Sequence, residues 1–406
     1  MKIPCPRILA FTVVCTAIVA IAGCSGGVGG SGDADTQASA DGTGDGTDQA
    51  PADSAAIKLG MLAPFSGSES AFGPYMANGA TLAIDEINAD GGVLGRQLEL
   101  ITEDDACDAT TAVAGANKLT TQGIVASVGG YCSSSAVPTV DILTGSGVPM
   151  VIPAANSNQL VDLGNPKVFL INGTGTQQAA AALAYAKHEG LSTVALLHDN
   201  SSYSKDLADS FNAQAEDSTV SSVLTEGVNK DEKDFSATVN NVLAENPDLV
   251  WWTGYYEAGG LIAKQLRDAG YAGQIMVADG SVDAKLAEIA GPQASQGLLG
   301  TFTQTPDMLE GHDDWISSYT EKFGGPPGPY STQAYDAVRV VAQAITDAGS
   351  TDGDAVATAL EAIDGMELFS GPLKFTPQHT LSSGGFVVVE VGPDGTFVFK
   401  ENPVDY

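Results

Sequence analysis

The stretch Ile57-Lys-Leu-Gly-Met-Leu62 begins the pattern that decides the fold, because its apolar run predicts a buried strand. Residues 79–88 follow with apolar side chains spaced for one face of a helix. Asp90-Gly91-Gly92 predicts the end of that helix, since these residues tolerate the left-handed conformation. Residues 97–102 then alternate as a second strand. A strand–helix–strand unit of this kind is typical of a parallel sheet.

The same alternation continues in two series along the chain. The first series includes a helix at 135–144 and ends near a strand at 148–152. The second runs from 167–171, through a strand at 249–252, to a strand at 274–277. Three more helices follow, and residues 385–391 and 396–400 predict two final strands. The sequence therefore predicts an α/β fold of two doubly wound parallel-sheet lobes joined by a hinge.

Composition excludes several classes of function. The 406 residues carry 17 Lys and Arg against 50 Asp and Glu, a net charge of -33. Phosphate backbones would repel such a chain, so nucleic-acid binding is excluded, and so is membrane contact through a basic surface. With four histidines in all, we expect no metal site, and no motif in the folded part predicts a cofactor. An apolar content of 43% is enough for a substantial core.

Residues 1–23 predict a lipoprotein signal peptide. Lys2 and Arg7 precede an uncharged apolar run at 8–21, which at about 14 residues is short for a membrane span of about 30 Å. Ile21-Ala-Gly-Cys24 resembles the bacterial lipobox, which implies that Cys24 is lipidated and becomes the first mature residue. The alternatives are an ordinary cleaved signal and a short anchor helix.

Residues 24–56, which begin with this cysteine, predict a flexible acidic linker. They are rich in Gly, Ser, Ala and Thr and contain six Asp, so they cannot bury enough apolar surface to fold. Such a segment would tether the folded body to a membrane.

The cysteine count predicts one disulfide in the folded body. Cys5 and Cys15 leave with the signal peptide, and Cys24 carries lipid, so Cys107 and Cys132 remain. Two cysteines in an exported chain most simply pair, although two free buried thiols are the alternative.

Ligands of open α/β sheets bind at the carboxyl ends of the strands. In this chain each predicted strand end is followed by a loop that offers a hydroxyl, an aromatic ring or a carboxylate. These loops are residues 64–73, 129–135, 153–157, 198–203, 254–257 and 278–280.

Several stretches, in the same order, resemble the bacterial leucine/isoleucine/valine-binding protein family. They are Asp85-Glu-Ile-Asn-Ala-Asp-Gly-Gly92, Asp104-Asp-Ala-Cys107-Asp108, Cys132-Ser-Ser-Ser135, Pro153-Ala-Ala155 and Glu232-Lys-Asp-Phe-Ser236. The resemblance covers nearly all of residues 57–400. Members are type I periplasmic binding proteins that supply branched-chain amino acids to ABC importers. The resemblance thus implies their two-lobed fold.

The resemblance also implies a set of polar contacts to a bound amino acid. Ser133 would bind the α-carboxylate through its hydroxyl and backbone N–H, which agrees with a serine loop at a helix N-terminus. Ala154 and Ala155 would contribute backbone groups, with the Ala154 carbonyl facing the α-ammonium. Asn156 would contact both ends of the ligand, and Asp279 would pair with the ammonium. The alternatives are a helix cap for Ser133 and a turn residue for Asp279.

Aromatic residues match positions that line the family's side-chain pocket or close over the ligand. The alternative for each of them is core or rim packing. The five residues are Phe72, Tyr131, Tyr203, Tyr255 and Tyr330. The resemblance further implies that a Cys107–Cys132 disulfide braces the loop of Ser133.

Three of the matched positions depart from the family. Asn156 stands where the family usually has Thr, Asp279 where it usually has Glu, and Tyr131 where it often has Leu. All three would contact the ligand directly. The resemblance therefore indicates the class of function, a solute-binding protein, more firmly than it indicates which ligand is bound.

We therefore predict a lipid-anchored, extracytoplasmic solute-binding subunit of an ABC importer. It would be a monomer, would deliver its ligand to a membrane permease, and would touch the membrane only through its lipid anchor. The ligand would be a small amino acid, branched-chain or otherwise apolar. The alternatives are a binding protein for a small amide or aromatic carboxylate, and a ligand-presenting sensor module.

Lobe boundaries follow from three expected chain crossings near residues 173, 301 and 384. Lobe 1 would comprise 57–173 plus 302–384, and lobe 2 would comprise 174–301 plus 385–406.

An enzyme is the other class of function. Ser133 with the neighbours His198 and Asp199 would be its triad, but sequence neighbours on a strand point apart, so we do not expect one.

Overall fold

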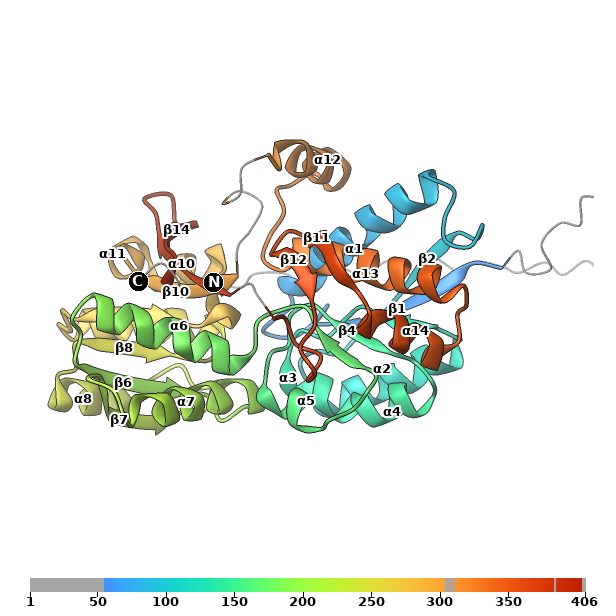
Figure 1. Cartoon of the computed structure of the whole chain (residues 1–406). Helices are drawn as coiled ribbons and strands as arrows, with labels where there is room; N and C mark the ends of the chain where they lie inside the picture. The colour runs from blue at the N-terminus through green and yellow to red at the C-terminus, as the bar shows by residue number, and fades with distance from the viewer. Residues whose placement is uncertain (1–54, 304–307, 309–310, 383–384, 404–406) are drawn as a thin grey trace, which may run out of the picture. The chain divides into compact units, whose positions relative to one another are not determined.

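The computed structural model describes residues 55–303, 308, 311–382 and 385–403. The expected signal peptide 1–23, Cys24 and nearly all of the expected linker lie outside the described residues. Within the described part, no helix combines the length and apolar character needed to cross a bilayer. Two large sheets and one two-stranded sheet organise this part of the chain (Figure 1).

The first large sheet has five strands in the order β2-β1-β3-β4-β5, and all of its neighbours are parallel. Apolar side chains fill most of its strands, as expected for a sheet covered on both faces. Its strands are β1 (Ile57–Ala63), β2 (Leu98–Asp104), β3 (Ala126–Ser127), β4 (Met150–Ile152) and β5 (Val168–Leu170).

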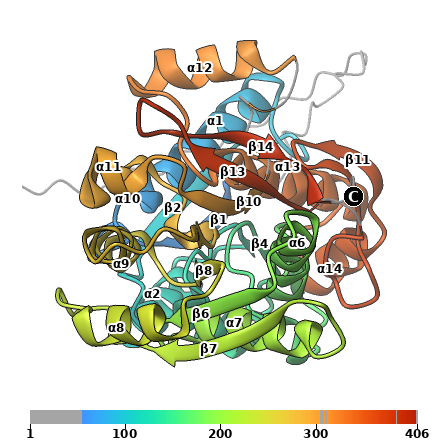
Figure 2. The ribbon, with the colours of Figure 1, turned by 90° about the vertical axis from the view of Figure 1, so that its left-hand side faces the viewer.

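The second sheet has seven strands in the order β14-β13-β10-β9-β8-β6-β7. Five are parallel: β6 (Thr193–His198), β7 (Ser221–Gly227), β8 (Leu249–Trp252), β9 (Gln274–Val277) and β10 (Leu299–Thr303). The C-terminal strand β13 (Phe386–Val391) pairs antiparallel with β10, and β14 (Phe397–Glu401) pairs antiparallel with β13 and forms the edge, as Figure 2 shows.

The parallel strands of both sheets follow one winding scheme. Strand β1 lies between β2 and β3, and β6 lies between β7 and β8, so each series runs outward in both directions from its first strand. The place where the strand order reverses is where such sheets form a ligand crevice. Two such places therefore exist, one in each sheet.

Helices cover both sheets, and each sheet with its helices is called a lobe below. In lobe 1, α1 (Phe72–Ala89) packs against α13 (Ser331–Ala348), while α2 (Ala109–Thr121) packs against α3 (Ser133–Ala136) and α4 (Val140–Gly145). Other elements of lobe 1 are α5 (Asn158–Asp162), α12 (Asp313–Phe323), α14 (Gly353–Glu361) and the hairpin of β11 (Asp364–Leu368) and β12 (Gly371–Lys374).

In lobe 2, helices α6 and α7 pack together, and α9 packs with α8, α10 and α11. The threonine Thr174 begins α6 with a capping box, in which its side chain and that of Gln177 satisfy each other's backbone N–H groups. The helices are α6 (Gly175–His188), α7 (Ser202–Ala215), α8 (Ser236–Glu245), α9 (Tyr256–Asp268), α10 (Ala284–Ala290) and α11 (Pro292–Ser295).

Three local expectations differ from the structure. Helix α1 begins at Phe72 instead of residue 79. The expectation missed its first turns because Gly73 and Pro74 are residues that usually indicate a loop. The helix expected at 135–144 is divided into α3, a 3-10 turn at Val137–Thr139 and α4, since Pro138 cannot donate a helical hydrogen bond. Strand β10 continues to Thr303, so the second chain crossing begins after this residue.

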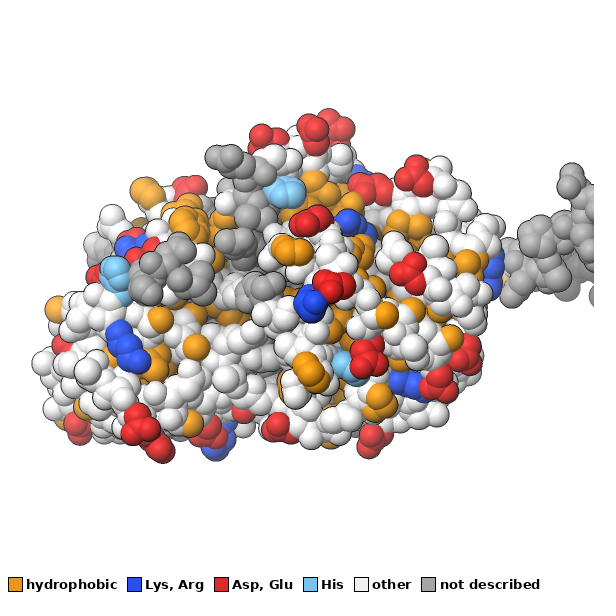
Figure 3. Space-filling model, in the orientation of Figure 1, with side chains coloured by type: hydrophobic (Ala, Val, Ile, Leu, Met, Phe, Trp, Pro, Cys, Tyr) orange, Lys and Arg blue, Asp and Glu red, His pale blue; other side chains and the backbone are white. Residues whose placement is uncertain are grey.

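Acidic side chains are dispersed over the surface in view in Figure 3 instead of forming one patch. Such a distribution fits a role of the negative charge in solubility.

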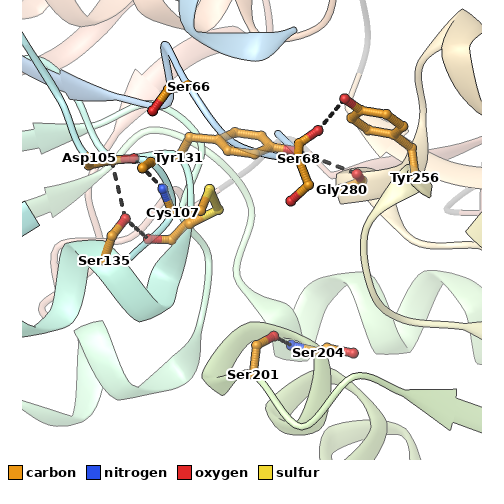
Figure 4. The surroundings of a disulfide bond; sticks show 12 residues. Ser66, Ser68, Asp105, Cys107, Tyr131, Ser135, Ser201, Ser204, Tyr256 and Gly280 are labelled. Atoms are coloured by element: carbon orange, nitrogen blue, oxygen red, sulfur yellow. Dashed lines mark hydrogen bonds between the residues drawn. A yellow bond between two sulfur atoms is a disulfide. The ribbon is translucent and has the colours of Figure 1, made fainter. Parts of the chain in front are cut away.

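The predicted disulfide is confirmed: Cys107 and Cys132 are bonded, with their Cα atoms 5.4 Å apart. It joins the loop after β2 to the start of α3 (Figure 4). Buried Asp105 supports the same junction by accepting hydrogen bonds from the Cys107 backbone (2.8 Å) and the Ser135 hydroxyl (3.2 Å). Burial raises the pKa of Asp105 to about 6.

Removing this disulfide should lower the free energy of unfolding by roughly 3–4 kcal/mol, because the bond closes a loop across a separation of 25 residues. The test is urea unfolding of the Cys107→Ser/Cys132→Ala double variant. Reductant should destabilise the wild type to a similar extent and leave the variant unaffected. Equal stability of the two proteins would show that the bond contributes nothing.

Candidate functional site

A small cavity lies between the carboxyl ends of strands from both lobes. Its volume is about 10 Å³, which is room for about one water molecule. The residues around it come from the segments after β3, β4, β8 and β9, from the start of α7 after β6, and from the residue before α13. They are Tyr131, Ala154, Asn156, Tyr203, Tyr255, Asp279, Gly280 and Tyr330.

Asp279 is the charged group of this cavity and links the two lobes. It follows β9, is 2% exposed, and accepts hydrogen bonds from the hydroxyls of Tyr203 and Tyr330, each at 2.5 Å. The Nδ2 of Asn156 donates a third bond at 3.2 Å. Tyr203 belongs to lobe 2, whereas Tyr330 and Asn156 belong to lobe 1. Burial raises the pKa of Asp279, although its hydrogen bonds act in the opposite direction.

The Asn156 amide is itself held by lobe 2. Its Nδ2 also donates to Oε1 of Gln178 at 3.1 Å, and Gln178 in turn donates to the hydroxyl of Thr301 at 2.8 Å. All three side chains are buried. This chain of bonds fixes which atoms of Asn156 face the cavity.

Tyr330 has an unusual backbone conformation. Its φ of 63° lies in the left-handed region that non-glycine residues seldom occupy. It directly precedes α13, and its 1% exposed side chain reaches Asp279. Backbone strain of this kind is typical of functional sites, where surrounding packing maintains it.

Gly280 was not singled out from the sequence, but the cavity requires it. Its N–H donates to the Tyr203 hydroxyl at 3.0 Å, and its carbonyl accepts from the Tyr131 hydroxyl at 3.4 Å, so it too connects the lobes (Figure 4). A Cβ added here would lie 2.9 Å from the ring of Tyr255. Only glycine therefore permits these rings to approach the loop.

Aromatic rings fill most of the space around the cavity. Phe72 stacks on Tyr131 with ring centroids 4.4 Å apart, and Tyr131 makes an edge contact with Tyr330 at 5.6 Å. Tyr203 and Tyr255 are 5.2 Å apart on the other lobe. Burial raises the pKa of all four tyrosines well above 10, so they present neutral hydroxyl groups.

Seven of the ten predicted ligand-binding residues line the cavity, and Ser133, Ala155 and Phe72 do not. Phe72 supports the ring of Tyr131 from behind. The Ser133 hydroxyl accepts from the backbone N–H of Ser157 at 3.2 Å, at the buried start of α3. Ala155 lies in the core of lobe 1.

The lobes also meet on either side of the cavity. The Tyr256 hydroxyl of lobe 2 donates to the carbonyl of Ser68 in lobe 1 (Figure 4). Asp206 on α7 accepts from the Ser157 hydroxyl at 3.0 Å and from the Asn158 backbone at 2.5 Å. The hydrogen bonds around Asp279 are therefore part of a wider contact between the lobes.

The contacts of Ser133 and His198 do not support a catalytic triad of Ser133, His198 and Asp199. His198 ends β6 in lobe 2, where its Nδ1 accepts from the backbone of Asn200 at 3.3 Å, and burial lowers its pKa. Ser133 in lobe 1 is engaged with Ser157.

One cluster among the described residues has metal-ligating atoms within 4.8 Å of one another, namely His188, Glu189 and Glu401. None of them lines the cavity. Both His188 and Glu189 are exposed, and exposed acidic groups commonly meet without a metal ion.

Comparisons with known proteins agree with this geometry. The family described as periplasmic binding protein matches residues 56–396. The leucine-, isoleucine-, valine-, threonine-, and alanine-binding protein of Pseudomonas aeruginosa is 33% identical over 84% of this chain and 91% of its own length.

Solved structures agree as well. A leucine-binding protein of Thermotoga maritima has a TM-score of 0.79 at 28% identity, covering 86% of this chain and 100% of its own. The branched-chain amino acid substrate-binding protein of Streptococcus pneumoniae, in complex with isoleucine, has a TM-score of 0.75 at 26% identity, covering 85% and 100%.

These proteins are binding proteins and not enzymes, and they confirm the resemblance and the two-lobed α/β fold expected from the sequence. The match spans nearly all of the folded body and both of its sheets. The chain therefore belongs to the periplasmic binding protein family, and it is an extracytoplasmic solute-binding protein.

Proposed function

We propose that this protein is the solute-binding subunit of an ABC importer and captures a small amino acid between its two lobes. The Pseudomonas aeruginosa relative is named for five small or branched amino acids, and the Streptococcus pneumoniae structure contains isoleucine. Branched-chain and other apolar amino acids are therefore the first ligands to test.

The buried carboxylate of Asp279 carries this proposal. A carboxylate shielded from water is unfavourable unless a cation or several donors satisfy it. Neutral hydroxyl and amide groups from both lobes converge on Asp279. The α-ammonium of an amino acid would bind there in place of some of these donors, and its positive charge would compensate the carboxylate.

The other contacts that we propose follow the arrangement of the loops. Ser133, Ala154 and Ala155 would bind the α-carboxylate and ammonium from lobe 1 through backbone and hydroxyl groups. Asn156 would bridge both ends, since its amide offers a donor and an acceptor. The ligand's side chain would contact the aromatic residues Phe72, Tyr131, Tyr203, Tyr255 and Tyr330.

Capture would require the lobes to move. A cavity of about 10 Å³ does not hold an amino acid, so the lobes or their tyrosines must separate before a ligand binds. We propose that they hinge at the three chain crossings. The expected bounds are 57–173 and 302–384 for lobe 1 and 174–301 and 385–406 for lobe 2, with the second crossing moved to the end of β10 at Thr303. A ligand gripped by both lobes favours closure, and a permease would recognise that closed state.

Anchoring is the last part of the proposal. The lipobox-like sequence before Cys24 supports cleavage of residues 1–23 and lipidation of this cysteine. The acidic segment 24–56 would then hold a monomeric binding body off the membrane.

Asp279→Asn should weaken amino-acid binding by about 2 kcal/mol or more, roughly thirtyfold, because the ligand ammonium would lose its charged partner. Titration calorimetry with the best ligand from a thermal-shift screen of amino acids measures the change. Asp283→Asn is the matched control: Asp283 is also buried but caps α10, and asparagine preserves that cap. Wild-type affinity in Asp279→Asn would refute the assignment of the ammonium.

Cys24→Ser should release the protein from the membrane fraction into the soluble fraction, since a serine hydroxyl does not take the lipid. Immunoblots of fractionated cells expressing the full chain would show the change. Cys15→Ser, which alters a cysteine inside the expected signal peptide, should leave the protein in the membrane fraction. Retention of both variants would rule out the lipid anchor.

A further inference from the structure

Three buried polar atoms near the cavity lack hydrogen-bond partners among the described residues. They are Oε2 of Glu69, Oδ2 of Asp199 and the hydroxyl of Tyr255. The exposed fractions of these residues are 3%, 7% and 7%. Polar atoms this deeply buried are normally paired, so each of them calls for an explanation.

These residues follow strand ends in both lobes. Glu69 lies in the loop after β1, and Asp199 lies directly after β6. Strands β1 and β6 are the first strands of their series, so the two carboxylates follow the places where the strand order reverses. Tyr255 lines the cavity and is fixed at its carbonyl by the indole N–H of Trp252 at 2.9 Å.

Hydrogen bonds place both loops beside the segment that carries Tyr255. The carbonyl of Ser68, next to Glu69, accepts from the Tyr256 hydroxyl. The Ser204 hydroxyl accepts from the Asp199 backbone N–H at 3.0 Å and lies 3.0 Å from the hydroxyl of Thr253. The pKa of Tyr255 is raised mainly by burial. The negative charge of Asp199 raises it further, and that of Glu69 contributes next. Glu69 also helps raise the pKa of Tyr131 and Tyr256. Both carboxylates therefore belong to loops that contact the segment of Tyr255 and Tyr256.

One cation, Lys230, neighbours both carboxylates, and it already has a carboxylate partner. Burial raises the pKa of Glu69 to about 8; Asp199 and Glu257 act in the same direction, whereas the Ser68 hydroxyl and Lys230 act against them. The Lys230 ammonium is paired with Asp231 at 2.8 Å. Glu257 is paired with Lys233 at 2.5 Å.

A ligand group with several N–H donors and a positive charge would satisfy all three atoms. Carboxylates and a phenol oxygen accept hydrogen bonds from ammonium or guanidinium groups, and charge-assisted bonds of this kind are the strong ones. An apolar side chain would instead leave Glu69 protonated and the Asp199 Oδ2 without a partner in a closed cleft.

We infer that Glu69, Asp199 and Tyr255 form a subsite for the cationic end of a ligand side chain, so that this protein prefers an amino acid with a terminal ammonium or guanidinium group. The inference rests on the proposed capture of an amino acid between the lobes, and it replaces the branched-chain and other apolar ligands of that proposal with cationic ones. It makes Glu69 and Asp199 specificity-determining residues, with Asp279 still facing the α-ammonium.

Titration calorimetry of the purified chain with L-lysine and L-norleucine tests this inference, because the two ligands differ only in the terminal ammonium. We expect L-lysine to bind wild-type protein at least about tenfold more tightly than L-norleucine. Glu69→Gln, which keeps the side-chain shape, should abolish this preference and leave L-norleucine binding within about twofold. Glu257→Gln is the matched control and should leave both affinities unchanged, since Glu257 is half exposed and paired with Lys233.

The pH dependence provides a second readout that a purely structural role of Glu69 would not produce. Binding of a cation favours ionised Glu69, whose pKa is about 8, so L-lysine affinity should rise roughly eightfold from pH 7 to 8.5. The same rise should be missing in Glu69→Gln and with L-norleucine, which controls for the shared α-amino group.

The outcomes separate the two proposals. Equal or tighter binding of L-norleucine by the wild type, or an unchanged preference in Glu69→Gln, would overturn the cationic subsite and leave amino-acid capture standing. If neither these ligands nor any other amino acid binds the wild type, amino-acid capture fails and the subsite fails with it.

Discussion

The buried carboxylate of Asp279 is the constraint on which the organisation of the cleft depends. It is 2% exposed at the end of β9, so its oxygens must be satisfied by protein groups or by a ligand. Two of its three hydrogen-bond donors, Tyr330 and Asn156, belong to lobe 1, although Asp279 itself belongs to lobe 2. The contact between the lobes therefore supplies the hydrogen bonds that the buried Asp279 carboxylate needs.

Other features of the cleft follow from this constraint. Tyr330 adopts a strained backbone at the start of α13, and its hydroxyl reaches Asp279. Gly280 lacks a side chain because two tyrosine rings occupy that space, and the disulfide Cys107–Cys132 fixes the loop that carries Tyr131. Each of these three features restricts the backbone or strains it. Together they hold tyrosine hydroxyl groups around the carboxylate of Asp279. Strain and close packing of this kind are expected where function is selected over stability.

The sequence predicts the architecture well because the fold depends on periodic burial. Strands β8 and β9 match their predicted bounds, since short apolar runs between polar loops have few alternatives. The start of α1 and the break at Pro138 were misjudged, because the first contains Gly73 and Pro74, which usually indicate a loop, and the second depends on a single ring. Cysteine counting was sufficient for the disulfide, because only two cysteines remain in the folded body.

The candidate site was only partly predictable. Positions matched to a family give residues such as Asp279 and Tyr203, which do meet in the structure. Gly280 and Glu69 have no such signal, because their importance depends on packing between loops far apart in the chain. Sequence patterns predict where strands end, but they do not show which side chains become buried when the two lobes come into contact.

The most direct test of the central claim is a crystal structure of the folded body with its bound amino acid. We expect the ligand to lie between the lobes, with its ammonium nitrogen within hydrogen-bond distance of the Asp279 carboxylate and its α-carboxylate at the loop of Ser133. A ligand bound elsewhere, or bound with its ammonium away from Asp279, would contradict the account.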